Sequence, residues 1–236
     1  MTTPDILKQN YIDICNKVST AAIKANRKPE DIKVLAVSKT HNYTIIADAI
    51  KAGIPIFAES YAQEFRDKYK DLSTHTDLAT NCEFHFIGHL QSNKAKYLVP
   101  FVTTIHTIDS INLAKEINKQ AEKINKKINV LIQVNTSGED AKSGIQPEHC
   151  IALIKEILPL SNLNLVGLMT IGTFSENEIL IRKEFSLLRN CLTDINTSIG
   201  LTLKELSMGM SHDFEIAIQE QATMIRIGTA IFGNRK

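Results

Sequence analysis

A lysine at the end of a short apolar segment is the residue of this sequence best suited to covalent chemistry. The segment Val34-Leu35-Ala36-Val37-Ser38-Lys39-Thr40 begins as an unbroken apolar run, which is typical of a strand buried on both faces of a parallel sheet. Lys39 would then lie at the carboxyl end of the strand, where such folds bind ligands. An apolar mouth would lower the pKa of the amine and help it attack a carbonyl group. The alternative is that the stem covers apolar surface while the amine stays in water.

Two loops late in the chain have the composition of an anion site. They read Ser207-Met208-Gly209-Met210-Ser211 and Arg226-Ile227-Gly228-Thr229-Ala230. Both combine small residues, hydroxyl groups and backbone N–H groups at the start of a helix or turn, which can hold a phosphate through dipoles. Either loop alone also fits an ordinary capped turn, with Ser211 as a helix cap and Gly228 as a turn residue.

The lysine and the two loops together predict a pyridoxal phosphate site. The lysine would form a Schiff base with the aldehyde, and the loops would hold the phosphate. Arg226 adds a detail, because its permanent charge beside the pyridine nitrogen would disfavour protonation of the ring and weaken the cofactor as an electron sink. The alternative is that Arg226 pairs with a carboxylate inside the fold.

An alternation of strands and helices must bring these residues together. Strands are predicted at residues 34–40, 54–57, 84–88, 104–108, 128–134, 163–169, 204–207 and 223–227, and helices at 5–25, 44–52, 61–72, 91–98, 176–195 and 211–221, with two more starting near 110 and 147. Eight alternating strands predict an α/β fold, a single (β/α)8 TIM barrel over residues 1–236 with an N-terminal helix and no second domain.

Composition excludes several classes of protein. The 236 residues are 43% hydrophobic and 22% charged, which suits one large globular domain. A formal net charge of +1 gives no electrostatic argument for binding nucleic acid or an anionic membrane. The cysteines are far apart and form no CxxC pair, so neither a zinc ribbon nor a disulfide framework is predicted. The start lacks a basic and apolar leader, and no run is long enough to span a membrane, so we expect a cytoplasmic protein.

Further motifs make the chain recognisable when they are taken in order. They are Ala36-Val37-Ser38-Lys39-Thr40, His85-Phe86-Ile87-Gly88, Leu90-Gln91-Ser92-Asn93-Lys94, Val134 to Gly144 with Lys142-Ser143-Gly144, Gly167-Leu168-Met169, Leu206 to Ser211 and Arg226 to Gly233. On these motifs the chain resembles the pyridoxal phosphate homeostasis protein family, also called YggS/PROSC or PLP-binding proteins. The barrel of that family is similar to the amino-terminal domain of alanine racemase.

The resemblance implies a set of cofactor contacts. The Schiff base would form on Lys39, and the other contacts would come from Met169 on one face of the ring, Arg226 near the pyridine nitrogen, and Ser211, Gly228 and Thr229 on the phosphate. The sequence departs from the family at Ala58-Glu59-Ser60, where the family has Gly-Glu-Asn, so Ser60 offers a hydroxyl in place of a longer amide. It also has His89 where the family usually has proline.

The resemblance further implies a holder of the cofactor with little or no catalysis, acting in vitamin B6 homeostasis. Apo-enzymes that need the cofactor are the candidate partners. The helical faces show no conspicuous apolar stripe, so we expect a monomer.

Two other functions remain open. A racemase needs two bases on opposite faces of the substrate carbon. In alanine racemase the second base is a tyrosine from an extra domain, and no tyrosine here follows a late strand. In the third interpretation the barrel binds another phosphate compound and Lys39 is only a charge partner. His85 and His89 span a turn, so we expect a buried His85 and an exposed His89, with no metal site.

Overall fold

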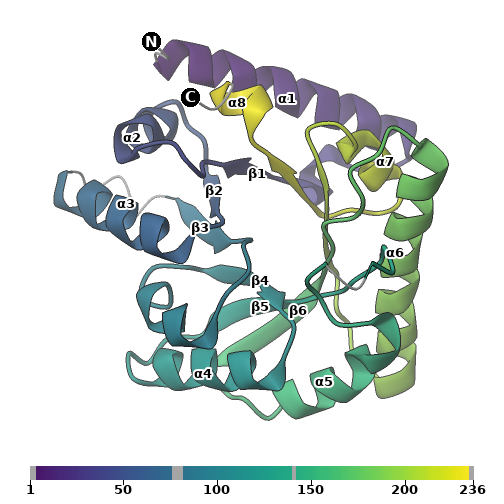
Figure 1. The fold of residues 1–236 in the computed structure, drawn as a ribbon. Helices are drawn as coiled ribbons and strands as arrows, with labels where there is room; N and C mark the ends of the chain where they lie inside the picture. The colour runs from purple at the N-terminus through teal and green to yellow at the C-terminus, as the bar shows by residue number, and fades with distance from the viewer. Residues whose placement is uncertain (1–3, 76–81, 140–141, 234–236) are drawn as a thin grey trace.

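Eight parallel strands close into a barrel in the computed structural model, which describes residues 4–75, 82–139 and 142–233 (Figure 1). The strands are β1 (Lys33–Val37), β2 (Ile56–Glu59), β3 (Glu83–Phe86), β4 (Thr104–Ile108), β5 (Ile128–Gln133), β6 (Leu163–Met169), β7 (Glu205–Met210) and β8 (Met224–Ile227). They pair in chain order, and β8 pairs with β1 from Lys33↔Met224 to Ala36↔Ile227. The predicted barrel is therefore confirmed.

Helices surround the barrel (Figure 1). The α-helices are α1 (Pro4–Lys24), α2 (Tyr43–Lys51), α3 (Ala62–His75), α4 (Ile111–Glu122), α5 (Cys150–Ile157), α6 (Glu178–Ile199), α7 (Phe214–Gln219) and α8 (Thr229–Phe232), with short 3-10 helices η1 (Pro29–Asp31), η3 (Ser92–Tyr97) and η4 (Pro147–His149). The predicted N-terminal helix is α1. It lies beside α8, where the Asn10 amide donates to the Ile231 carbonyl at 2.9 Å.

The sequence prediction was wrong in detail around the seventh strand. β7 continues to Met210, beyond the predicted end at Ser207. The following helix begins at Phe214, after a turn at residues 211–213, so Ser211 is not its cap. The Asp213 carboxylate accepts a hydrogen bond from the Met210 N–H at 2.6 Å, which stabilises the turn in place of a first helical turn. The predicted helix at 91–98 is the 3-10 helix η3.

The apolar core has two parts, one on each face of the sheet. Val34 and Ala36 belong to the large cluster between strands and helices. Leu35 and Val37 belong to a small cluster with Ala58 and Met224. Alternate residues of a strand point to opposite faces, so the small cluster lies inside the barrel. This explains why β1 is a continuous apolar run.

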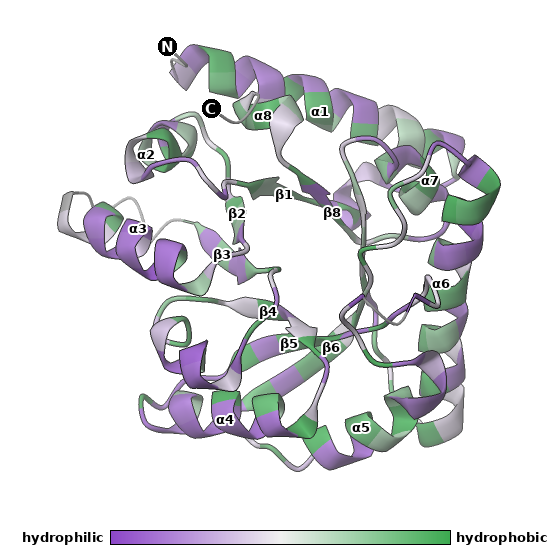
Figure 2. Ribbon diagram, viewed as in Figure 1, coloured by the Kyte–Doolittle hydropathy of each residue, from purple (hydrophilic) through white to green (hydrophobic). Residues whose placement is uncertain are grey.

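The helices are amphipathic, as expected for elements that cover a barrel. Figure 2 shows hydrophobic and hydrophilic residues along both α1 and α4. In α4 the buried residues recur at helical spacing: Leu113, Ala114, Ile117 and Ala121. Within the described ranges, no helix has the length and apolar character needed to cross a membrane. Cys15, Cys150 and Cys191 are free thiols.

Candidate functional site

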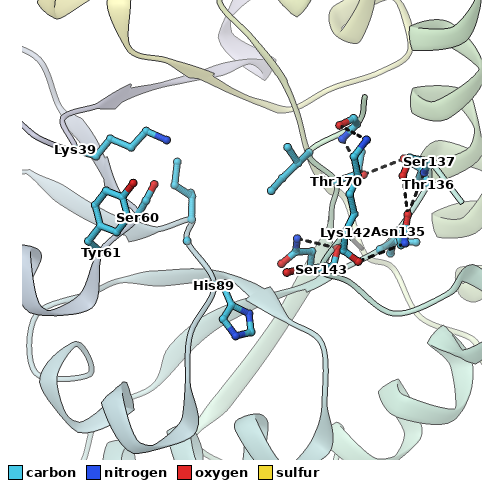
Figure 3. Close-up of a pocket in the computed structure, with 16 residues that line it drawn as sticks. Lys39, Ser60, Tyr61, His89, Asn135, Thr136, Ser137, Lys142, Ser143 and Thr170 are labelled. Atoms are coloured by element: carbon cyan, nitrogen blue, oxygen red, sulfur yellow. Dashed lines mark hydrogen bonds between the residues drawn. The ribbon is translucent and has the colours of Figure 1, made fainter. Parts of the chain in front are cut away.

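A cavity of about 320 Å³ opens at the carboxyl ends of the strands (Figure 3). It is lined by residues at or just after the carboxyl ends of five strands: Lys39, Ser60, Tyr61, Ile87, Gly88 and His89 on one side, and residues 133–137, 142–143 and 170–172 on the other. In Figure 3 the Lys39 side chain extends over Ser60 and Tyr61 toward the wall that carries Thr170 and Lys142. The structure therefore brings two of the predicted residues, Lys39 and Ser60, to one cavity.

The strand register places Lys39 beside Ser60. Val37 pairs with Ala58, so the residues two positions further along both strands are neighbours. The fully buried Ser38 donates its hydroxyl to Glu59 Oε1 at 2.8 Å. Thr40, on the other side of the lysine, has the left-handed backbone angle φ 70° and donates its N–H to Glu64 Oε1 at 2.6 Å. Both neighbours of Lys39 are thus held, and the direction of its side chain is set by the backbone.

A cluster of ion pairs around the buried Lys68 supplies these contacts. Lys68 Nζ lies 2.8 Å from Glu59 Oε1, 2.5 Å from Glu64 Oε1 and 2.9 Å from the Ser38 carbonyl oxygen. Glu59 has no exposed surface, and burial raises the pKa of its carboxyl against the attraction of Lys68. The sequence analysis missed Lys68, although Glu64 and Lys68 lie four residues apart on α3, a spacing that favours ion pairs.

The loops after β7 and β8 reach the same end of the barrel. Met210 pairs with Arg226 and Ile227 pairs with Ala36, so Ser211 and Gly228 follow their strands close to the edge that carries Lys39. A Cβ atom on Gly228 would lie 3.5 Å from the Val37 carbonyl oxygen. Ser211 is half-buried, and the exposed Thr229 opens α8. These three residues lie outside the cavity lining, beside it along the edge of the barrel.

Arg226 lies inside the barrel and is bonded to the cavity wall. Its guanidinium donates to the Thr170 carbonyl at 2.9 Å and to Ser207 Oγ at 3.0 Å. Burial lowers the pKa of Arg226 to about 10, against the attraction of Asp213, so the side chain is charged at neutral pH. Thr170 lines the cavity, and Met169, the residue before it, is fully buried at the end of β6. The sequence left open that Arg226 pairs with a carboxylate. Its hydrogen-bond acceptors in the structure are instead a hydroxyl and a backbone carbonyl.

The opposite wall of the cavity carries a second lysine that sequence reasoning did not single out. Lys142 Nζ lies 2.6 Å from Glu139 Oε1 and 3.0 Å from Thr173 Oγ1. The glycine of the motif Lys142-Ser143-Gly144 could have indicated a close backbone contact in this wall. Gly144 has φ 121°, and a Cβ there would lie 2.8 Å from the Asn135 backbone nitrogen, so only glycine fits.

The two histidines lie as the sequence predicted. The His85 side chain is 1% exposed and that of His89 is 61% exposed. His85 points into the barrel, where it contacts His106, whereas His89 lines the cavity. The two rings therefore do not face a common metal.

The donor set fits an aldehyde that carries a phosphate. One wall offers an amine to a carbonyl group, and the edge beside it offers hydroxyl groups and the first backbone amides of α8, which have no partner within their helix. Arg226 brings a fixed cation to the cavity wall. The cavity volume also falls within the range of small-molecule sites, about 300–1,000 Å³.

The sequence is related to proteins of known family over almost its whole length. A profile of the alanine racemase N-terminal domain matches residues 17–236. The pyridoxal phosphate homeostasis protein of Aquifex aeolicus is 42% identical over 223 residues, which are 94% of this chain and 96% of the relative. The chain belongs to the pyridoxal phosphate homeostasis protein family. Its Escherichia coli K12 member is 40% identical over 237 residues, with 97% of each chain covered.

Solved structures agree with this family assignment. PipY of Synechococcus elongatus, solved with pyridoxal phosphate bound, matches with a TM-score of 0.79 and 30% identity over 92% of this chain and 100% of that chain. Alanine racemase of Clostridium difficile matches with a TM-score of 0.73 and 18% identity. Only 57% of the racemase chain is covered, so this likeness concerns the barrel fold.

Proposed function

We propose that this protein binds pyridoxal phosphate through Lys39 and acts in pyridoxal phosphate homeostasis, with little or no catalysis of its own. The observation that carries the proposal is the position of Lys39, whose side chain extends into the cavity while both of its neighbours are held by glutamate side chains, the buried Glu59 and the partly exposed Glu64. The names of the relatives and the cofactor bound to PipY support the same conclusion.

Each residue of the site has a distinct role in this proposal. The Lys39 amine forms the covalent bond with the cofactor aldehyde, and Ser211, Gly228 and Thr229 bind the phosphate. Met169 packs against the ring, and Ser60 contacts its oxygen side. Bound pyridoxal phosphate supplies a reactive aldehyde and an electron-withdrawing ring.

Arg226 accounts for weak catalysis in this proposal. Its guanidinium is held by Ser207 and Thr170 and keeps its charge, so it disfavours a second positive charge on the ring nitrogen. A ring that stays unprotonated withdraws electrons less strongly. The site is therefore better suited to holding the cofactor than to stabilising carbanions.

The arrangement of Tyr61 argues against racemisation. Racemisation needs a second base opposite the lysine. Tyr61 lines the cavity but lies on the same side as Lys39 (Figure 3). We expect alanine racemisation no faster than with dissolved cofactor. Alanine racemisation clearly faster than that rate would contradict the proposal that the protein holds the cofactor with little or no catalysis.

The test is to trap the adduct and locate it. The purified protein is mixed with pyridoxal phosphate, reduced with borohydride and digested, and the modified peptide is identified by mass spectrometry. We expect the label on Lys39 in the wild type. Lys33→Ala, at the other end of β1, is the matched control and should keep the label. A label on another lysine in the wild type would refute the site, and no adduct would favour a barrel that binds some other phosphate compound.

We further propose that the protein is a single-domain monomer that works in the cytoplasm and passes the cofactor to apo-enzymes. A loaded protein should activate a pyridoxal-phosphate-dependent apo-enzyme faster than the same protein carrying a borohydride-reduced cofactor. Light scattering after size exclusion should give one chain mass. Equal activation by both forms would contradict the transfer of the cofactor, and a mass of two chains would contradict the monomer.

A further inference from the structure

A chain of polar side chains crosses the interior of the barrel and ends at Arg226. Glu83 Oε2 lies 3.2 Å from His85 Nε2, and His85 Nδ1 lies 2.9 Å from His106 Nε2. His106 Nδ1 lies 2.9 Å from Ser207 Oγ, which accepts from Arg226 at 3.0 Å. β4 and β7 are not neighbours in the sheet, so the contact between His106 and Ser207 spans the interior.

The two ends of the chain lie at opposite ends of the barrel. Glu83 is the first residue of β3, and its side chain is 57% exposed. Lys33, the first residue of β1, forms an ion pair with Glu205 at the same end. At the other end, Arg226 donates to the carbonyl of Thr170, which lines the cavity. The chain therefore connects the amino-terminal surface of the barrel to the wall of the cofactor cavity.

The chemistry of the two ends fixes the direction of every hydrogen bond. Arginine can only donate, and an ionised carboxylate can only accept. Ser207 Oγ accepts from Arg226 and so has its own hydrogen available for His106 Nδ1. His106 then carries its hydrogen on Nε2 and donates to His85 Nδ1, and His85 donates from Nε2 to Glu83. With this assignment every atom in the chain has a partner of the right kind.

The local charges agree with two neutral rings. Burial lowers the pKa of His85 and brings that of His106 well below its usual value, and Arg226 and Lys33 lower the pKa of His106 further. The hydrogen bond from His85 lowers the pKa of Glu83, which keeps that carboxyl ionised. A charged His106 would also place a hydrogen on Nδ1, against the hydroxyl hydrogen of Ser207.

We propose that Ser207, His106 and His85 are positioning residues that hold Arg226 against the cofactor ring, and that Glu83 sets the direction of the chain from the opposite surface. This inference rests on the proposed function, because Arg226 must face the cofactor for the chain to matter. Arg226 has two acceptors, Ser207 and Thr170. The Ser207 hydroxyl accepts from Arg226 through a lone pair, and its hydrogen bond to His106 turns the hydroxyl hydrogen away from the guanidinium and fixes the orientation of the group.

The first test needs no cofactor. Nitrogen-15 NMR of labelled histidines distinguishes a ring with hydrogen on Nε2 from one with hydrogen on Nδ1. At pH 7 we expect both His85 and His106 to be neutral, with hydrogen on Nε2. In Ser207→Ala the Nδ1 signal of His106 should shift to the position of an acceptor without a donor. Hydrogen on Nδ1 in either ring of the wild type would overturn the proposed direction.

The second test measures cofactor affinity and the absorption maximum of the bound cofactor. Ser207→Ala should weaken pyridoxal phosphate binding about tenfold and shift the maximum, because Arg226 loses one of its two acceptors. Glu83→Gln, a surface change that leaves the fold intact, should weaken binding about two- to threefold. Thr103→Val is the control, because it removes a hydroxyl bonded to the Phe84 carbonyl outside the chain and should change binding less than about twofold.

The outcomes separate this inference from the proposed function. Wild-type protein that takes up no pyridoxal phosphate refutes the function, whereas the histidine tautomers are measured without it. The positioning role would be refuted if the tautomers are as expected but Ser207→Ala and Glu83→Gln bind pyridoxal phosphate as tightly as Thr103→Val does. If Ser207→Ala does not fold, both the histidine NMR signals and the cofactor affinity are measured in Glu83→Gln. A His85 signal and a pyridoxal phosphate affinity that both equal those of the wild type would then overturn the proposal.

Discussion

The ammonium group of Lys68 lies 2.9 Å from the carbonyl oxygen of Ser38, the residue immediately before Lys39. The same ammonium neutralises Glu59, which bonds the Ser38 hydroxyl. One buried cation thus organises the backbone that presents Lys39. A cofactor site can be precise only if its supporting side chains are themselves fixed.

Removal of this cation should destabilise the protein. Lys68→Met leaves the carboxylate of Glu59 buried without its partner, and breaking a buried pair costs about 3 kcal/mol of unfolding free energy. Urea unfolding measures the change. Lys70→Met, an exposed position on the same helix, should change stability by less than about 0.5 kcal/mol. A similar loss of unfolding free energy in the two variants would show that the Lys68 ion pairs do not stabilise the protein.

A close backbone contact shapes the wall of the cavity. A Cβ atom on Gly88 would lie 1.9 Å from the Ser60 carbonyl oxygen, and backbone cannot move aside as a flexible side chain can. Gly88→Ala should therefore displace the segment with Ser60 and weaken cofactor binding about tenfold or more. Gly53→Ala meets nothing within 4 Å, and its φ of +88° costs about 1 kcal/mol of stability without affecting binding. Titration and urea unfolding of both variants test the distinction.

The barrel was predictable from the sequence because the patterns that indicate a strand and a helix are local and recur along the chain. β4 and β6 have the predicted bounds, since each lies between clear breaks in the sequence. The lysine was equally visible, because a charged residue ends the apolar run of β1. Lys68 was not, since its partner Glu59 lies on another element and only the fold brings the two together.

The chain of hydrogen bonds through the barrel was hidden for the same reason. His85 and His106 are separated by 21 residues, and His106 and Ser207 by 101. No two of the three residues are close in the sequence, so nothing there marks them as partners. His85 and His106 lie on the neighbouring strands β3 and β4, whereas the contact between His106 and Ser207 depends on barrel closure, which places β4 and β7 face to face across the interior.

The two buried histidines predict a decrease in stability below neutral pH. Burial lowers the pKa of both rings in the folded protein, whereas an unfolded histidine titrates near its usual value of about 6.5. Below that pH the unfolded chain binds more protons, so the free energy of unfolding falls, by up to about 1.4 kcal/mol per pH unit for each ring. Above it neither form is protonated and the contribution vanishes. Urea unfolding between pH 8 and pH 5.5 measures this slope.

A comparison of variants assigns the slope to the chain inside the barrel. His106→Phe should give a flatter dependence on pH, whatever its absolute stability, because one buried titrating ring is gone. His149→Gln, at an exposed position, should keep the wild-type slope. An unchanged slope in His106→Phe would show that the loss of stability arises from other groups.

The proposed phosphate contacts predict a difference between two vitamin B6 compounds. If Ser211 donates its hydroxyl to the phosphate, Ser211→Ala should weaken binding of pyridoxal phosphate about tenfold, since a hydrogen bond to a charged group contributes about 1.5–3 kcal/mol. Pyridoxal lacks the phosphate and should bind wild type and variant equally. Ser186→Ala removes an exposed hydroxyl on α6 and is the matched control for both compounds. Equal weakening of both compounds by Ser211→Ala would place this hydroxyl away from the phosphate, because only a contact to the phosphate can distinguish the two.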